Sequence, residues 1–408
     1  MALDNLSPND IFFQNILHKG MRDKTIQDVV LLEKKAALNK GENYLSYLTR
    51  FTLKYVCNVP KGLAFERVDR KAHLIMKEAP GANDLAGEYI RRNKVFDNER
   101  HMLEDVLPQI EELVGKKLGP KVYYSLNKPN VIIMEDLMPL GFRNRNRKVG
   151  FNEAEVFMTL ENLADFHAGS ILLEEQNPGS LSRISNAFVS RNLPEGFFRF
   201  ISTSLASIGA GIRDWQNGKF VSISDKLQKV SEEITQKLFV VFEYDEDELL
   251  VLNHGDMWMN NIMFKDNENG GVQECRFVDY QMSIWTSPAG DLAYFLSLVP
   301  EISLKFTHDD IFLQKFLDRL SSTMKKLGCV ATPPTLEQLK KSMHKRRHLA
   351  LMAALTFYPK MIAEDDEIEP MDEVMKNGVA KVNLLKNPKV REIFVKILPI
   401  LDERGYLD

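Results

Sequence analysis

The sequence lacks the features that mark several protein classes. Its 408 residues include three cysteines, too few and too far apart for a disulfide framework or a zinc pattern, so a reducing compartment is expected. No apolar run approaches the roughly 20 residues needed to cross a bilayer. Asp4 and Asp10 also interrupt the N-terminal segment before it reaches the length of a signal peptide. We therefore expect a cytoplasmic protein without membrane insertion.

A large excess of charge of one sign is also absent. The 57 acidic and 53 basic residues leave a net charge of −4, which gives no general attraction to nucleic acid or to an acidic membrane. Hydrophobic residues make up 44% and charged residues 27%, as in folded globular proteins. We expect a monomer of one large or two unequal domains, with no nucleic-acid partner.

Hydrophobic periodicity changes near residue 137 and predicts two lobes. Before that point, strands are predicted at residues 45–56, 62–68, 72–77, 121–125 and 130–134. A helix with an apolar stripe from Val95 to Leu113 is predicted between the third and fourth of these strands. After residue 137, helical patterns dominate, and one β segment spans residues 249–280.

An α+β fold in two lobes follows from this pattern. Residues 1–136 would form a small, β-rich N-terminal lobe with a leading helix, and residues 137–408 a larger, mostly helical lobe. A helix of the second lobe would begin with Asn152 and Glu155 as a capping pair. A cleft between two such lobes is a common place for a ligand.

The most informative stretch lies within the β segment of the second lobe. Asp256 follows an apolar strand, Asn261 directly precedes the next strand, and Asp279 directly follows the returning one. Reflecting these two strands about Gly270 places Asn261 opposite Asp279. Such oxygen ligands suit Mg²⁺, which completes its shell with phosphates and water. Asp256 would then orient a substrate hydroxyl and accept its proton.

A second group of candidates lies in the first lobe. Lys77 ends an apolar run, so it would point toward the cleft as the cation for ATP phosphates. Glu99 lies on the apolar stripe of the following helix, where a carboxylate is costly unless paired. Lys77 and Glu99 therefore predict each other as an ion pair. Glu88 is the weaker alternative partner, and a lone lysine at a strand end is more often simply solvated.

Two backbone sites complete the predicted nucleotide pocket. The amides of Gly41, Glu42 and Asn43 would reach phosphate oxygens, although this turn contains a single glycine. Glu135 and Leu137 lie in the connection between the lobes, where the backbone would hydrogen-bond adenine. A plain turn and a plain linker are the alternative interpretations of these two segments.

Several motifs together resemble one known family. They are HGDMWMNN at residues 254–261, VDYQ at 278–281, GDLA at 290–293, LADFHA at 163–168 and GENY at 41–44. They are similar to motifs of the ecdysteroid kinase-like family, in the choline-kinase and aminoglycoside-phosphotransferase branch of the protein-kinase-like superfamily. The resemblance implies a bilobal protein-kinase-like fold and ATP- and Mg²⁺-dependent phosphorylation of an ecdysteroid or another lipophilic alcohol. It also implies Asp256 as the catalytic carboxylate and Asn261 and Asp279 as the metal ligands. Lys77 and Glu99 match the phosphate-binding lysine and its helix glutamate.

The acceptor is expected to be small. Few residues separate Asp279 from Asp291 and no Ala-Pro-Glu motif follows, which leaves little room for a platform that would bind a peptide. Aromatic and methionine side chains of the second lobe suit a bulky apolar alcohol, although core packing is the stronger explanation for each of them. Two alternatives stay open. One is a choline- or aminoglycoside-type kinase that uses the acidic residues 364–369, and the other is a nucleotide-binding pseudokinase.

Other polar residues are expected to have structural roles. His167 and His254 are predicted to be hydrogen-bonded core histidines, and Asp291 to accept backbone hydrogen bonds from the loop that carries Asp256. The basic clusters at residues 143–148 and 340–348 are expected to be solvated, with an anionic ligand as the alternative.

Overall fold

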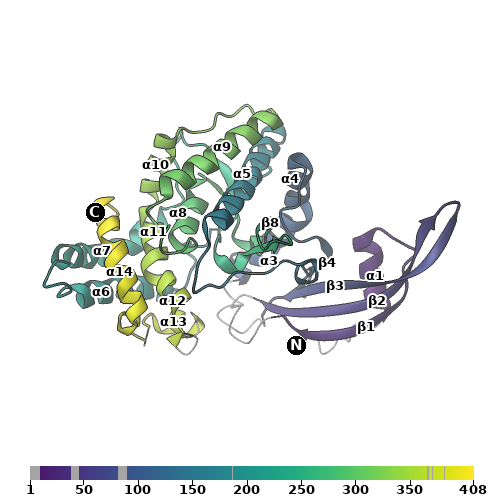
Figure 1. Cartoon of the computed structure of the whole chain (residues 1–408), viewed down its shortest axis with the longest axis horizontal. Coiled ribbons are helices and arrows are strands. Elements are labelled where there is room, and N and C mark those ends of the chain that lie inside the picture. The colour runs from purple at the N-terminus through teal and green to yellow at the C-terminus, as the bar shows by residue number, and fades with distance from the viewer. Residues whose placement is uncertain are drawn as a thin grey trace.

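The computed structural model divides the chain into a smaller lobe built on a β-sheet and a larger helical lobe (Figure 1). It describes residues 10–37, 46–80, 90–185, 187–364, 367–369, 371–380 and 382–408. Gly41, Glu42 and Asn43 of the predicted phosphate loop lie outside the described residues, and so does Glu88. The α+β class and the two-lobed arrangement are confirmed.

The smaller lobe contains a five-stranded antiparallel sheet in the order β1-β2-β3-β5-β4. Its strands are β1 (Gln27–Ala36), β2 (Tyr47–Lys61), β3 (Ala64–Glu78), β4 (Val122–Asn127) and β5 (Asn130–Glu135). Helix α1 (Asp10–Met21) covers one face of this sheet, and its Phe13 packs against Phe51 of β2 with ring centroids 5.3 Å apart. The lobe thus has a hydrophobic core of its own.

Two features of the sheet differ from the sequence-based expectation. Strand β1 is not predicted because it lies at the sheet edge with most side chains exposed, so it lacks an apolar alternation. The break predicted between the strands at residues 62–68 and 72–77 is wrong, because Asp69 and Arg70 pair with Val56 and Tyr55 within the long hairpin of β2 and β3. The outer end of this hairpin projects from the lobe (Figure 1), so polar residues occupy strand positions there without ending the strand.

The predicted helix from Val95 to Leu113 is confirmed as three continuous segments. These are α3 (Val95–His101), the π-helical turn η2 (Met102–Val106) and α4 (Leu107–Val114). Its apolar stripe packs into the core of the larger lobe and not into the core beneath the sheet. The helix therefore connects the two lobes.

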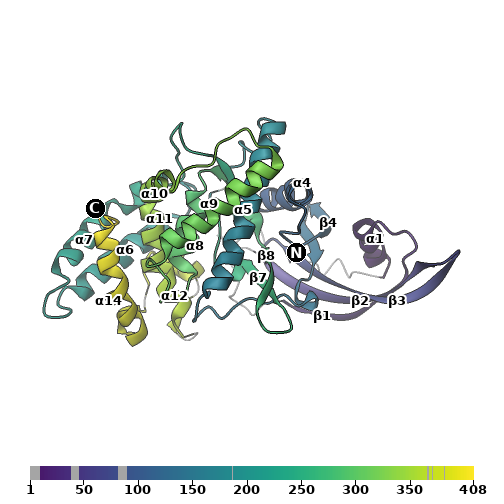
Figure 2. The same cartoon turned by 45° about the horizontal axis from the view of Figure 1, so that its top comes forward.

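Helices dominate the larger lobe, as Figures 1 and 2 show. They are α5 (Glu153–Gln176), α6 (Glu195–Ile212), α7 (Val221–Phe239), α8 (Ala289–Leu298), α9 (Asp309–Leu327), α10 (Leu336–Lys345), α11 (Arg347–Met352), α12 (Tyr358–Ile362), α13 (Met371–Asn377) and α14 (Pro388–Glu403), with a π-helical turn η6 (Ala353–Phe357) between α11 and α12. Asn152 and Glu155 form the predicted capping box at the start of α5. The lobe boundary between residues 136 and 137 stays a prediction.

Two small β-ladders carry the candidate site in the larger lobe. Strand β6 (Val251–Asn253) pairs with β9 (Ile284–Thr286), and β7 (Ile262–Asp266) pairs with β8 (Val272–Phe277). Short 3₁₀ turns, η4 (Met259–Asn261) and η5 (Tyr280–Met282), lie next to these strands. The loops around the ladders contain the residues that the sequence assigned to catalysis.

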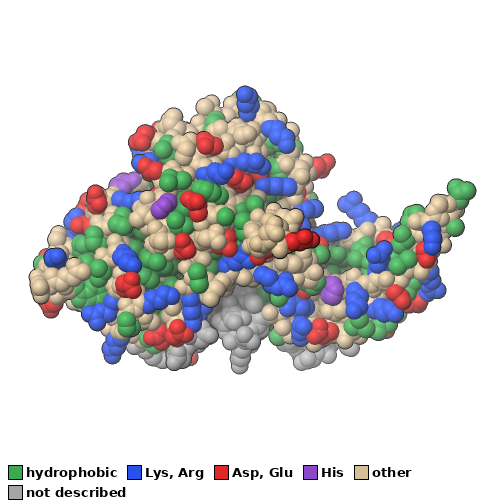
Figure 3. All heavy atoms as spheres, in the orientation of Figure 1, with side chains coloured by type: hydrophobic (Ala, Val, Ile, Leu, Met, Phe, Trp, Pro, Cys, Tyr) green, Lys and Arg blue, Asp and Glu red, His purple; other side chains and the backbone are tan. Residues whose placement is uncertain are grey.

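The surface of the molecule is mixed in charge. Figure 3 shows acidic and basic side chains interspersed over one face, and hydrophobic side chains at the far end of the projecting hairpin. Within the described part of the chain, no helix has the length and hydrophobicity that crossing a membrane requires.

Candidate active site

Strand β3 presents Lys77 at the junction of the two lobes. The side chain is almost completely buried, and its Nζ lies 2.6 Å from Oε2 of Glu99 on α3. On its other side, Nζ donates to Oδ1 of Asp279 at 2.5 Å and to Oε1 of Gln281 at 3.3 Å. The predicted ion pair of Lys77 with Glu99 is confirmed. The lysine also joins the small lobe to the loop that carries Asp279.

Burial and ion pairing shift the pKa of Lys77 in opposite directions. Burial alone would lower the pKa of Lys77, but the charges of Asp279 and Glu99 outweigh it and raise the pKa, so the amine stays protonated. Burial raises the pKa of the Glu99 carboxyl, and the charge of Lys77 opposes this rise. The ammonium is thus held by two carboxylates at the lobe junction.

The hairpin of β7 and β8 positions the two proposed metal ligands. Its register differs by one residue from the predicted register. Ile262 pairs with Phe277, and the amide of Val278 donates to the carbonyl of Asn261 at 2.9 Å. Asn261 therefore lies opposite Val278, and its predicted position opposite Asp279 is wrong. The pairing of Asp266 with Val272 centres the turn at residue 269 and not at Gly270, and the bulge next to Asp266 compensates for only part of this offset.

Asp279 follows directly after the end of this hairpin. Its backbone is left-handed, with φ of 70°, which is uncommon for a residue with a side chain and is found at functional sites. This conformation turns the chain into η5, and the Asp279 carboxylate lies between Lys77 and the amide of Gln281.

Asp256 and Asn261 lie in direct contact. The side-chain amide of Asn261 donates to Oδ2 of Asp256 at 2.9 Å and to its backbone carbonyl at 3.0 Å. The amide oxygen of Asn261, the atom that would bind a metal, accepts no hydrogen bond from the described residues. Burial raises the pKa of Asp256 to about 8, and the nearby charge of Asp279 adds to this rise. A cation close to these groups would favour the ionised carboxylate.

Buried polar residues hold the loop that carries Asp256. Asp291 accepts hydrogen bonds from the amides of His254 and Gly255 at 2.7 and 2.8 Å, and Nε2 of His167 lies 3.2 Å from Oδ2, the oxygen that also accepts the His254 amide. The His254 ring binds the carbonyl of Val278 at 3.0 Å, and burial lowers the pKa of this ring. The structural roles predicted for these residues are confirmed.

The arrangement agrees with the comparison to protein families. A model of the ecdysteroid kinase-like family matches residues 40–329. The chain belongs to the ecdysteroid kinase-like family. It is thereby a small-molecule kinase.

Individual relatives of this ecdysteroid kinase-like protein are distant. A kinase-like protein of Caenorhabditis elegans is 24% identical over 298 residues, which cover 70% of each chain. Among solved structures, an ADP-bound aminoglycoside phosphotransferase, APH(2'')-Ib, is 13% identical and covers 86% of this chain and 99% of its own at a TM-score of 0.28. An amicoumacin kinase with AMP-PNP, Ca²⁺ and amicoumacin is 10% identical, with 86% and 91% coverage and a TM-score of 0.39. At such TM-scores these likenesses carry no argument about the site.

The connection between the lobes contains Asp136, a carboxylate for which no role was predicted from the sequence. Glu135 ends β5 and forms an ion pair with Arg276 at 3.2 Å, and Leu137 is buried. Between them, the carboxylate of Asp136 pairs with Arg50 and accepts the amide of Met138 at 3.1 Å. A role of Glu135 and Leu137 in binding adenine stays a prediction.

Gly255 of the ecdysteroid kinase-like site has no room for a side chain. Its φ is +83°, and a Cβ would lie 1.9 Å from the carbonyl oxygen of Met282. Gly255→Ala should therefore displace the loop and lower turnover on the order of 100-fold, the cost of misplacing a catalytic group by about 1 Å. Gly270→Ala is the matched control, because Gly270 has a similar φ of +79° but no atom near its Cβ position. Equal turnover by the two variants would contradict this prediction.

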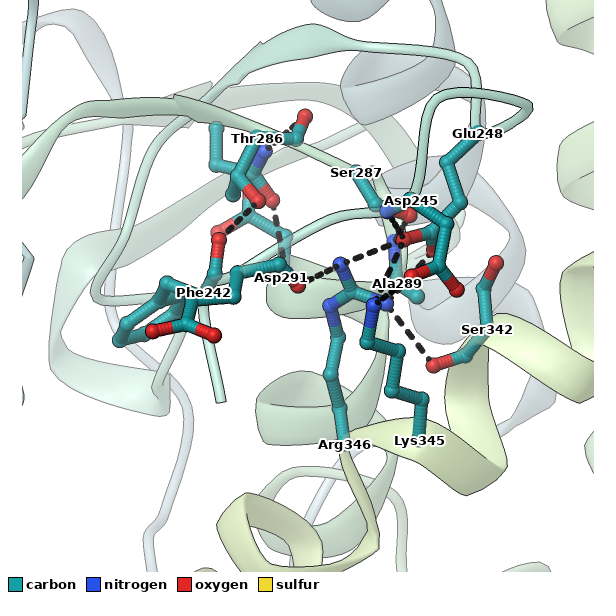
Figure 4. Close-up of polar contacts among 12 residues, drawn as sticks. Phe242, Asp245, Glu248, Thr286, Ser287, Ala289, Asp291, Ser342, Lys345 and Arg346 are labelled. Atoms are coloured by element: carbon teal, nitrogen blue, oxygen red, sulfur yellow. Dashed lines mark hydrogen bonds and ion pairs between the residues drawn. The ribbon is translucent and has the colours of Figure 1, made fainter. Parts of the chain in front are cut away.

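A buried arginine holds the segment that precedes β6 (Figure 4). Arg346 is fully buried and binds both carboxylate oxygens of Glu248 at 2.7 and 3.2 Å, as well as the carbonyl of Glu243 at 3.0 Å. Nearby, Lys345 pairs with Asp245 at 2.7 Å. These contacts fix the segment that leads into β6 and then to the catalytic loop. The expectation that the basic cluster at residues 340–348 is solvated is wrong for Arg346.

Loss of this arginine should destabilise the protein. Arg346→Met leaves the Glu248 carboxylate buried without its partner, which should lower the free energy of unfolding by about 3 kcal/mol in urea denaturation. Lys341→Met, an exposed position on α10, is the control and should change it by less than about 0.5 kcal/mol. Burial alone would raise the pKa of Glu248, but hydrogen bonds from Arg346 and Ser342 lower it to about 2 from an ordinary 4.5. The stabilisation is therefore fully present above pH 4.5 and is lost as the pH falls toward 2.

Proposed function

We propose that the protein transfers the γ-phosphoryl group of ATP, with Mg²⁺, to a hydroxyl of a small lipophilic alcohol such as an ecdysteroid, a related steroid alcohol or a xenobiotic alcohol. The observation that carries this proposal is the position of Lys77, whose Nζ lies 2.5 Å from Asp279 and 2.6 Å from Glu99. A lysine from the small lobe and a carboxylate from the large lobe meet there, as phosphate- and metal-binding groups of a kinase must.

The donor set around Asp279 suits Mg²⁺. One carboxylate and the amide oxygen of Asn261 are oxygen ligands, and Mg²⁺ commonly uses few protein ligands together with nucleotide phosphates. Among the described residues, no group of three or more His, Cys, Asp or Glu is placed to hold a metal alone. When bound, Mg²⁺ would neutralise charge on the transferring phosphates. Asn261 and Asp279 would hold it, and Lys77 would bind phosphate oxygens.

Asp256 is proposed to act on the acceptor. Its carboxylate is positioned by the Asn261 amide and its loop by Asp291, so it can orient the acceptor hydroxyl and accept the hydroxyl proton. The remaining oxygen of the acceptor would then form the bond to phosphorus as the bond to ADP breaks.

Aromatic side chains next to Asp256 support a lipophilic acceptor. Tyr294 lies close enough to Asp256 that this charge adds to the rise in the tyrosine pKa, which burial chiefly causes. The Phe188 ring lies 5.7 Å from Tyr294 and 6.0 Å from Phe357, and both phenylalanines are partly exposed. These rings form an apolar surface beside the proposed catalytic carboxylate.

An acidic pocket for a cationic acceptor finds less support. Of the acidic residues proposed for it, Glu364 forms an ion pair with Lys148, and Glu367 accepts a hydrogen bond from Asn387. Both carboxylates are thus engaged in contacts with neighbouring segments. An acceptor such as choline would need carboxylates directed at its cation.

A mass-spectrometric screen tests the proposed function. The purified protein is incubated with ATP, Mg²⁺ and a library of hydroxylated molecules that includes steroid alcohols, choline and aminoglycosides. A mass increase of one phosphoryl group on steroid or other apolar alcohols is expected. Transfer to choline or aminoglycosides alone would contradict the lipophilic acceptor, and no transfer to any compound would favour the pseudokinase.

A further inference from the structure

A polar cavity lies where the two lobes meet. Its volume is about 230 Å³, and its walls come from the residues that lead into α3 and from the segment between α5 and α6. The first wall contributes Arg92 and Lys94, and the second contributes Ser190 and Asn192. Asn192 donates to the side chain of Asn93 at 3.1 Å, which joins the two walls. Parts of both lobes therefore build this cavity.

The cavity shares a wall with the catalytic loop. Met282 lines it, and the carbonyl of Met282 lies against Gly255, the residue before Asp256. The backbone next to Met282 is fixed by Asn98 of α3, which donates to the carbonyl of Gln281 at 2.9 Å. The cavity and the catalytic loop therefore both contact Met282.

The lining has the chemistry of an anion site. Two cations, Arg92 and Lys94, face it together with hydroxyl and amide groups, and no carboxylate is among its described lining residues. The hydroxyl of Ser190 is buried and has no hydrogen-bond partner among the described residues. A buried hydroxyl without a partner is costly, so it indicates a ligand that would satisfy it.

We propose that this cavity binds an anionic group of the acceptor, a carboxylate, sulfate or phosphate. This proposal rests on the proposed function and adds that the acceptor carries a negative charge. About 30 Å³ suffices for one water molecule, so 230 Å³ accommodates a sulfate-sized group and neighbouring atoms. The acceptor is then an amphipathic molecule with a hydroxyl at Asp256 and an anionic end at Lys94. Its apolar body would lie on the aromatic surface that includes Phe188.

Matched acceptors test the charge preference. The probes are hydroxylated bile acids and their methyl esters, which differ only in one carboxylate. For the wild type, the KM of an acid should be about tenfold lower than the KM of its ester, as one charge-assisted contact of ordinary strength would cause. Lys94→Gln and Arg92→Gln should abolish this difference and leave the KM for ATP unchanged. Lys219→Gln, an exposed position remote from the cavity in sequence, is the control. Equal KM values for acids and esters in the wild type would overturn the proposal.

A second readout does not depend on turnover. Inorganic sulfate should raise the melting temperature of the wild type and of Lys219→Gln, and should raise it less in Lys94→Gln. If no acceptor is phosphorylated, the proposed function fails while the sulfate measurement still tests the cavity. Sulfate stabilisation equal in all variants would overturn the anion site. Sulfate binding at the cavity without any preference for acids over esters would overturn the assignment to the acceptor and indicate a free anion as ligand.

Discussion

Replacing Asp256 by asparagine is expected to lower kcat by about 10³- to 10⁴-fold, as loss of a positioned general base does. Asparagine has nearly the same size as aspartate and keeps the same neighbours, but its amide cannot accept the hydroxyl proton. Phosphate transfer is measured with the best acceptor from the library. Nucleotide affinity should change little, because Asp256 contacts Asn261 and lies outside the ion pair of Lys77.

The control for this substitution is Glu268→Gln in the exposed turn between β7 and β8, which removes a carboxylate from the same hairpin. Its turnover should match the wild type. If Asp256→Asn retained near-normal turnover, Asp256 would not be the catalytic carboxylate.

Replacing Asp279 by alanine is expected to remove the Mg²⁺ dependence of nucleotide binding. Asp279 would supply the charged metal ligand, and it also holds Lys77 at 2.5 Å. Loss of a residue that only supports a ligand costs roughly 10- to 100-fold in metal affinity, so loss of the ligand itself should cost more. Calorimetry of AMP-PNP binding with and without Mg²⁺ measures the effect.

Asp279→Asn provides the second variant. It tolerates the left-handed backbone at this position, so it separates loss of the metal ligand from loss of the local fold. Both variants should bind AMP-PNP about as well as the wild type when Mg²⁺ is absent. A Mg²⁺-dependent affinity unchanged in both variants would exclude Asp279 as a ligand.

Sequence patterns predicted the elements that have a strong local signal. The apolar stripe of Val95 to Leu113 marks a helix, and the misplaced carboxylate on it identifies Glu99 as the partner of Lys77. A polar residue buried among apolar ones needs hydrogen-bond partners. The structural roles of His167 and Asp291 could therefore be predicted.

Other features depend on tertiary contacts that no local pattern records. Strand β1 is exposed at a sheet edge, and the hairpin of β7 and β8 turns at residue 269 and not at Gly270, so Val278 lies opposite Asn261. Arg346 lies in a stretch of basic residues that is typical of a solvated helix face, yet its partner Glu248 is 98 residues away along the chain. Buried pairs of this kind become visible only when distant segments meet.

The position of Arg346 has a consequence for where the chain can be shortened. The family match ends at residue 329, before this arginine. The segment that precedes the catalytic loop nevertheless relies on Arg346 to neutralise Glu248. A truncated form that ends with the matched region would lack that counter-charge, so the C-terminal helices belong to the smallest unit that can fold with its catalytic loop in place.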